Sequence, residues 1–139
     1  MVRVTIQTNQ SPYYVQSIVQ KMTIFRPATV LLILCLFTVG SIPAVGKAFP
    51  GNMHLVTHLV AYALIAISFG LGWQSMQAMH LVAIVTTIGV IHEMSEIITH
   101  SHPFEFKDAI VNGFGAFLGA SILYGLQKLR QKEKPPGFF

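Results

Sequence analysis

Residues 89–108 read GVIHEMSEIITHSHPFEFKD, and they connect one apolar run to the next. The stretch contains three histidines and four of the five acidic residues of the chain. His92, Glu96 and His100 are spaced four apart, which places them on one face of a helix. A short loop then follows, and the next helix is expected to begin at about Asp108. The stretch therefore predicts the end of one helix, a connection and the start of another.

The composition of the whole chain indicates a membrane protein. Of its 139 residues, 53% are hydrophobic and only 10% are charged, whereas a soluble domain carries about 25% charged residues. The mean hydropathy of +0.59 leaves too few polar residues to cover a soluble surface. The single cysteine, Cys35, excludes an intrachain disulfide and any zinc motif built on cysteines.

Four apolar segments are each about long enough to cross a bilayer. The predicted fold is therefore all-α, an integral membrane four-helix bundle. The expected spans cover about residues 28–45, 54–73, 79–99 and 108–127.

The segment before the first span is expected to form a separate amphipathic helix. Ser11-Pro12 is typical of a helix start, apolar residues recur at helical spacing behind it, and Arg26-Pro27 is expected to end the helix. Such a helix would lie in the membrane interface, and packing against a partner protein is the alternative. The predicted segments are therefore an N-terminal polar segment with its interfacial helix at residues 1–27, a membrane domain at residues 28–127 and a C-terminal tail at residues 128–139.

The distribution of basic residues predicts the topology. Seven of the nine Lys and Arg lie in the two terminal segments, and the formal net charge is +4. Four spans put both termini on one side of the membrane, which the positive-inside rule makes the cytoplasmic side, with residues 128–139 as a basic tail. The loops at residues 46–53 and 100–107 would then face outward. Basic residues at the two ends of an apolar chain do not form a nucleic-acid-binding face, so the expected partner is membrane lipid.

This topology brings polar residues of three spans into the outer leaflet. An ionised side chain costs at least about 2.5–3.5 kcal/mol at the centre of a membrane, so these residues are expected to face the interior of the bundle and one another. Glu93 lies about 60° around the helix from Glu96, at 100° per residue. The three helical stripes are His54, His58 and Tyr62, then His92, Glu96 and His100, then Asp108 and Asn112.

Three interpretations of these polar residues remain open. The first is a hydrogen-bonded network that fixes helix packing, and the second is recognition of an external polar ligand or lipid headgroup. The third is a zinc or copper site at His92, Glu96 and His100, because imidazoles and carboxylates at this spacing suit these metals. The run HEMSE is not the HExxH pattern of zinc proteases, and no serine or cysteine nucleophile lies beside it. An enzyme is therefore not expected.

The fourth predicted span carries small residues on one face. Gly115 and Gly119 lie four apart in VNGFGAFLGASILYG. Small residues at this spacing let two helix backbones approach closely. They are expected to pack against another helix, either in this chain or in another protein.

Several of these residues follow one another along the chain in an order that resembles a family pattern. It begins with His58 and Tyr62 in HLVAY, continues with Glu93 and Glu96, and ends with Asp108, Asn112, Gly115 and Gly119 in DAIVNGFGAFLG. Over about residues 54–123 this order resembles the VanZ-like family of small bacterial membrane proteins. The resemblance implies the four-span fold and a place in a bacterial cytoplasmic membrane. The family is named for a protein linked to resistance against the glycopeptide teicoplanin, and the resemblance implies no reaction.

The chain departs from the family pattern at polar positions. His54-Leu55 replaces the usual Asp-Lys, Glu96 stands where Gln is usual, and His102 stands where the loop usually has Arg. A histidine at position 102 makes that site sensitive to pH in principle. The candidate ligand or network residues are His54, His58, Tyr62, Glu93, Glu96, His102, Asp108 and Asn112.

Three hypotheses for the function follow. The first is a non-catalytic VanZ-like membrane protein that acts through an outward-facing polar pocket and helix packing, with an envelope lipid, a glycopeptide or a neighbouring protein as its ligand. The second is an accessory subunit of a larger respiratory, photosynthetic or monooxygenase complex in the membrane. The third is a metal-binding membrane protein.

Overall fold

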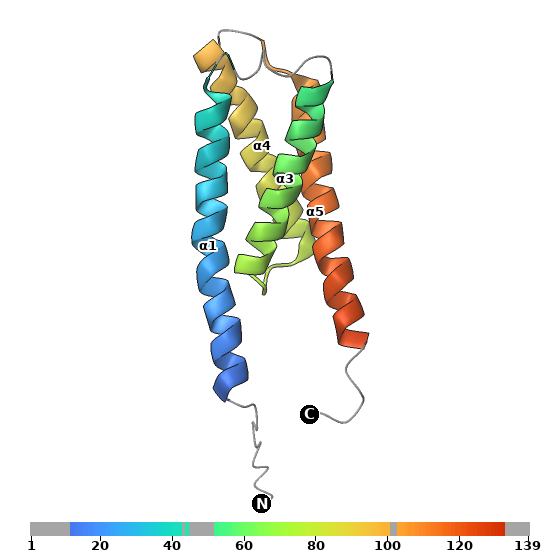
Figure 1. Ribbon diagram of the computed structural model, residues 1–139. Coiled ribbons are helices and arrows are strands. Elements are labelled where there is room, and N and C mark those ends of the chain that lie inside the picture. The colour runs from blue at the N-terminus through green and yellow to red at the C-terminus, as the bar shows by residue number, and fades with distance from the viewer. Residues whose placement is uncertain (1–11, 43, 45–51, 101–102, 133–139) are drawn as a thin grey trace, which may run out of the picture.

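In the computed structural model of this chain, the described residues form four packed α-helices (Figure 1). The structure describes residues 12–42, 44, 52–100 and 103–132, and these contain no strand. The all-α prediction is therefore confirmed for this part of the chain. The helices are α1 (Pro12–Gly40), α3 (Met53–Gly72), α4 (Ala78–His100) and α5 (Phe106–Lys132).

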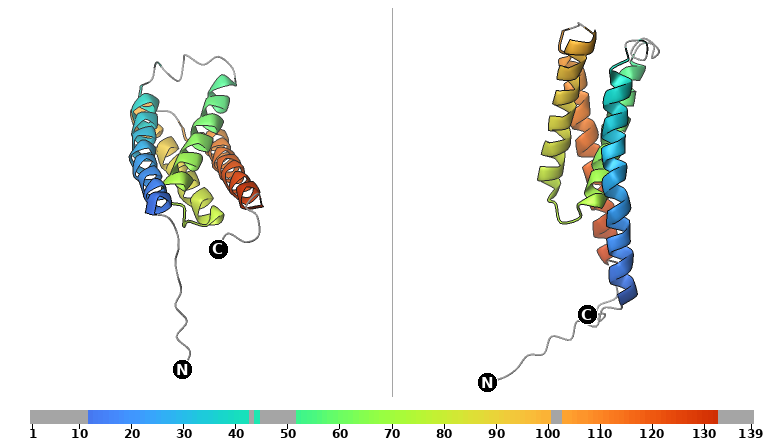
Figure 2. Two further views of the ribbon diagram at one scale, coloured as in Figure 1. Left: turned by 60° about the horizontal axis from the view of Figure 1, so that its bottom comes forward. Right: turned by 90° about the vertical axis from the view of Figure 1, so that its left-hand side faces the viewer.

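Successive helices run in opposite directions (Figures 1 and 2). The end of α1, the start of α3, the end of α4 and the start of α5 therefore share the upper end of the molecule in Figure 1. The start of α1 and the end of α5 lie at the opposite end. Helix α3 contacts each of the other three helices, with its largest interface against α5. The 20 residues of α3 thus form the centre of the packing.

Three of the helices are long and apolar enough to cross a membrane. Their qualifying segments are Met53–Gly72, Ala78–Thr99 and Phe106–Leu129, which agree with the last three predicted spans. The described apolar part of α1 is shorter, at Ile24–Gly40.

The predicted end of the first span is wrong, because α1 ends at Gly40 and not near residue 45. Ser41 and Ile42 form a final turn, with their N–H groups donating to the carbonyls of Phe37 and Val39 at 3.0 and 3.1 Å. Glycine is a poor helix former, and Ile42 precedes a proline in the sequence, which disfavours helical backbone. Helix α5 instead extends to Lys132, into the segment predicted as a tail.

The predicted helix end at Arg26-Pro27 is also wrong, because α1 continues through Pro27. A proline inside a helix removes one hydrogen bond, and contacts with a neighbouring helix can hold such a helix together. Thr29 supplies such a contact, since its hydroxyl lies 2.8 Å from that of Ser68 and also donates to the carbonyl of Phe25. Residues 12–40 therefore form one element, and in this described range no separate helix ends at Arg26.

The interface between α3 and α5 depends on glycine. A Cβ atom built on Gly115 would lie 2.5 Å from the carbonyl oxygen of Leu59, and one on Gly119 would lie 2.3 Å from that of Ala63. Both distances are shorter than real Cβ contacts allow, so only glycine permits this approach. The structure thus places both predicted packing glycines directly against the α3 backbone.

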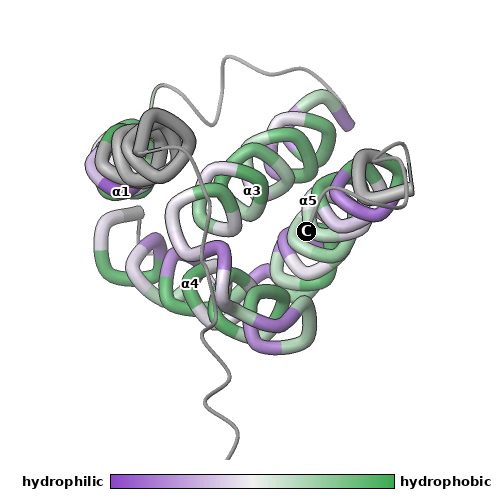
Figure 3. The backbone as a smooth tube through the Cα atoms, turned by 90° about the horizontal axis from the view of Figure 1, so that it is seen from below, coloured by the Kyte–Doolittle hydropathy of each residue, from purple (hydrophilic) through white to green (hydrophobic). Residues whose placement is uncertain are grey.

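Large apolar side chains cover the outside of the helices. Leu31 and Leu34 of α1, Ile98 of α4, and Phe114 and Phe117 of α5 are all more than half exposed. Hydrophobic colour covers much of every described helix in the view along the bundle (Figure 3). The interior by contrast combines an apolar core around Leu81 and Val85 with several buried polar side chains. An apolar exterior around a partly polar interior is the pattern of a helix bundle surrounded by lipid.

Candidate functional site

Five polar side chains from three helices meet near the upper end of the bundle. We call them the polar cluster: His58 of α3, His92, Glu93 and Glu96 of α4, and Asn112 of α5. They lie about 6–12 Å inside the helix ends, at 1.5 Å per residue. Their helices run in alternating directions, and that alternation brings residues far apart in the sequence to one depth.

Asn112 of α5 bonds to both α3 and α4 within the polar cluster. Its Nδ2 donates to Glu93 Oε1 at 3.1 Å, and its Oδ1 accepts a hydrogen bond from His58 Nδ1 at 2.9 Å. Asn112 is fully buried, so both amide atoms need these partners. The side chain therefore links α3, α4 and α5 at a single point.

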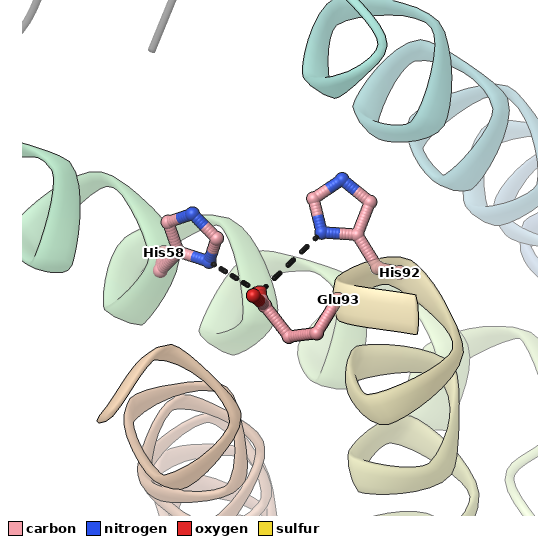
Figure 4. A group of neighbouring side chains, drawn as sticks. All are labelled: His58, His92 and Glu93. Carbon is pink, nitrogen blue, oxygen red and sulfur yellow. Dashed lines mark ion pairs between the residues drawn. The ribbon is translucent and has the colours of Figure 1, made fainter. Parts of the chain in front are cut away.

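The remaining distances in the polar cluster exceed hydrogen-bond length. Glu93 Oε1 lies 3.6 Å from His58 Nδ1 and 3.8 Å from His92 Nδ1 (Figure 4), and His92 Nε2 lies 3.6 Å from Glu96 Oε1. Neither ring nitrogen of His92 has a hydrogen-bond partner, nor has Glu93 Oε2. His92 is 2% exposed and Glu93 1%. Leaving such buried groups without a hydrogen bond costs about 1–3 kcal/mol each, so the arrangement calls for something beyond packing.

Aromatic rings and the end of α1 enclose the polar cluster. Phe37 meets the His92 ring edge-on at 5.1 Å, and the Tyr62 ring stacks on His58 at 6.4 Å. Gly40 lies directly over α4, because a Cβ atom there would be 2.3 Å from His92 Nε2 and 2.9 Å from Glu96 Oε1. The last turn of α1 thus closes the site from the side.

A second polar group lies above the polar cluster, at the ends of α3 and α5. His54 Nε2 is 3.6 Å from Asp108 Oδ1, and Glu105 brings a third potential ligand atom into the same group. Asp108 is buried, whereas Glu105 is exposed. We call these three residues the rim group. It lies between the polar cluster and the end of the bundle.

The predicted polar residues divide into those that the structure brings together and those that it does not describe. His58, Glu93, Glu96 and Asn112 meet in the polar cluster, with Tyr62 packed beside them. His54 and Asp108 belong to the rim group. The side chain of His100 and the whole of His102 lie outside the described residues, so their predicted roles stay predictions.

The combination of potential metal ligands differs from the predicted set of His92, Glu96 and His100. The described residues that converge are His58, His92 and Glu93, whose ligand atoms all lie within 4.8 Å of one another. The reason is helical phase: Glu93 points to α3 and α5, while Glu96 points to α1. Sequence spacing within one helix could not reveal a ligand from a second helix.

The sequence also does not predict that α1 contributes to the site. Phe37 and Gly40 contact His92, but the only signal in the sequence is a glycine at the end of an apolar run. The polar cluster offers no nucleophile either, because the Ser95 hydroxyl donates to the carbonyl of His92 in its own helix at 2.7 Å. The chemistry available among these residues is proton exchange, hydrogen bonding and metal ligation.

The fold and site together define a class: a small helical protein with three helices apolar enough to cross a membrane and a buried histidine–carboxylate cluster between them. No family model, no curated protein and no solved structure matches the chain.

Proposed function

We propose that the chain is a non-catalytic integral membrane protein that binds a small ligand, from the outer side of the membrane, at the polar cluster. Three membrane-length helices and the exposed apolar side chains around them support residence in a membrane. The four-span organisation that the VanZ-like resemblance implies fits a bacterial cytoplasmic membrane. With the basic termini in the cytoplasm, the upper end in Figure 1 faces outward.

One observation carries the proposal of binding. Both ring nitrogens of His92 and the Oε2 atom of Glu93 are buried without a hydrogen-bond partner, although buried polar groups in proteins are nearly always paired. Another buried polar pair of this chain follows the usual rule, since the hydroxyls of Thr29 and Ser68 lie 2.8 Å apart. A ligand at the polar cluster supplies the missing partners. The absence of an adjacent nucleophile favours binding over catalysis.

Topology is tested by cysteine labelling in a Cys35→Ser background, which removes the single native thiol. Glu105→Cys places a thiol at the rim group, and Ser75→Cys places a matched exposed thiol in the turn at the other end. A membrane-impermeant maleimide applied to intact cells is expected to label position 105 only. Labelling of position 75 before permeabilisation, or release of the chain by an alkaline wash without detergent, contradicts the proposal.

Binding is tested by native mass spectrometry of the protein extracted in a mild detergent. The unmodified chain is expected to retain a small ligand, Glu93→Gln to lose it, and His80→Ala, at the opposite end of α4, to keep it. The mass of the adduct distinguishes a metal ion, a lipid and a glycopeptide. A retained second protein chain favours the accessory-subunit alternative, and equal spectra for all three proteins contradict binding at the polar cluster.

A further inference from the structure

We infer that the ligand of the polar cluster is a divalent transition-metal ion of the zinc type, bound by His58 Nδ1, His92 Nδ1 and Glu93 Oε1. This inference rests on the proposed binding function and names the chemical class of its ligand. The three atoms come from two helices and converge on one point (Figure 4).

The distances between the three atoms fit a shared ion better than direct hydrogen bonds. Zinc binds imidazole nitrogen and carboxylate oxygen at about 2.1 Å in tetrahedral geometry, which separates neighbouring ligand atoms by roughly 3.4 Å. Glu93 Oε1 lies 3.6 Å from His58 Nδ1 and 3.8 Å from His92 Nδ1, and the three residues each offer a ligand atom within 4.8 Å of the other two. Hydrogen bonds between them would need about 2.7–3.2 Å.

The burial of His92 is the second, independent observation. Its side chain is 2% exposed, its Nδ1 faces Glu93, and neither ring nitrogen has a hydrogen-bond partner. A buried imidazole with an open nitrogen is the state that a metal ion completes. Imidazole and carboxylate together suit zinc, and also copper, whereas an all-oxygen site suits magnesium and calcium.

Glu96 occupies the position of an orienting residue. Histidines that ligate metals usually donate their other ring N–H to a carboxylate, which fixes the tautomer and the ring orientation. If Nδ1 of His92 binds the ion, Nε2 carries the proton, and Nε2 is the atom that faces Glu96 Oε1 at 3.6 Å. Gly40 leaves room for this pair, because any side chain there would collide with both atoms.

Metal binding replaces one hydrogen bond of the polar cluster. His58 Nδ1 cannot donate to Asn112 Oδ1 while it holds an ion, so its proton moves to Nε2 and Asn112 Oδ1 loses this donor. Asn112 keeps its donation to Glu93 and acts as a positioning residue for the carboxylate.

The experiment uses the full chain purified in detergent, stripped with a chelator and titrated with zinc chloride. We expect stoichiometric zinc by elemental analysis and imidazole scattering in the zinc X-ray absorption spectrum. His92→Ala and Glu93→Gln are each expected to lower zinc affinity by more than about tenfold, since loss of even an outer-shell partner costs about that much. His80→Ala is the matched control, an exposed histidine at the other end of α4, and should bind as tightly as the unmodified chain.

The spectrum of the unmodified protein keeps the test decisive if a variant fails to fold. Zinc at background level, zinc bound without imidazole scattering, or equal affinity in folded His92→Ala overturns the metal assignment. A chain that inserts with the proposed topology and retains a lipid at the polar cluster in place of zinc overturns the metal alone and leaves the binding function standing. A chain that fails the labelling test but still binds zinc at these residues overturns the proposed topology and leaves the metal assignment standing.

Discussion

The two halves of the bundle are held together by different interactions. In the lower half of Figure 1, small and apolar side chains such as Gly70, Leu81 and Leu123 fill the interior. In the upper half the same three helices meet through His58, Glu93 and Asn112. The buried polar side chains of the lower half, such as Thr29 and Ser68, have hydrogen-bond partners. The upper half instead contains buried atoms of His92 and Glu93 without a hydrogen bond.

This difference suggests that one kind of contact stabilises the bundle and that the other belongs to the proposed binding site. Within a membrane, lipid tails are as apolar as leucine, so helices associate through close packing and hydrogen bonds and not through the hydrophobic effect. The close contacts of Gly115 and Gly119 with α3 supply the packing. The polar cluster supplies fewer hydrogen bonds than its buried groups require, and this shortage is what supports the proposed ligand binding. The predictions below test this division.

The largest effect is expected at the glycine interface, from Gly119→Ala. The new Cβ would lie 2.3 Å from the Ala63 carbonyl oxygen, which is backbone and cannot rotate away. Overpacking of this kind costs about 1–3 kcal/mol, and occasionally more, so we expect a loss of stability at the upper end of that range or failure to fold. Thermal unfolding in a mild detergent, followed by circular dichroism, measures it.

Gly125→Ala is the matched control for that substitution. Gly125 lies in the same helix, is exposed, and a Cβ there meets nothing within 4 Å. Alanine is the better helix former by about 0.5–1 kcal/mol, so this variant should be slightly more stable than the unmodified chain. If both variants lose stability equally, close packing against α3 is not what holds α5 in place.

The second effect concerns the polar cluster and is measured on the apoprotein. Asn112→Leu removes the amide that donates to Glu93 Oε1, and loss of a buried hydrogen-bond partner costs about 1–3 kcal/mol. Adding Glu93→Gln should recover part of that loss, because a neutral amide costs less to bury than a carboxylate. Unfolding of both single variants and the double variant gives the coupling energy. Strict additivity would show that the two residues do not act together.

Hydropathy and helical phase predicted most of the fold, but only part of the site. The bounds of α3 and α4 follow from the apolar runs around His58 and His92, and the close approach at Gly119 follows from small-residue spacing. The continuation of α1 through Pro27 could not be predicted, because a contact with another helix accompanies it. The Thr29 hydroxyl in α1 contacts the Ser68 hydroxyl in α3, and a contact between helices cannot be read from the sequence of one helix. Helical phase also could not choose between Glu93 and Glu96 as the partner of His58, since that choice depends on where α3 lies.

A third, smaller effect tests the contact between α1 and α3. Ser68→Ala removes the hydroxyl that lies 2.8 Å from that of Thr29, and polar contacts between membrane helices average about 0.6 kcal/mol. Thr87→Val is the control, because that hydroxyl bonds only to the Ala83 carbonyl of its own helix on an exposed face. A double-mutant cycle of Ser68→Ala with Thr29→Val measures the pair directly. A coupling energy of zero would mean that this hydroxyl pair does not help to hold α1 against α3.

The smallest effect is expected from Arg26→Lys, at the end opposite the polar cluster. Arg26 Nε donates to the carbonyl of Gly72 at 3.0 Å, and its guanidinium lies 5.3 Å from the centre of the Trp73 ring. Lysine keeps the positive charge but loses the planar group that makes both contacts. Because Arg26 is exposed and a lysine ammonium can still lie over the Trp73 ring, we expect a loss below about 0.5 kcal/mol, seen as a small drop in Tm that Lys107→Arg, at an exposed site, does not reproduce. A drop as large as that of Asn112→Leu would place a main determinant of stability at this end and would contradict the division between the two halves.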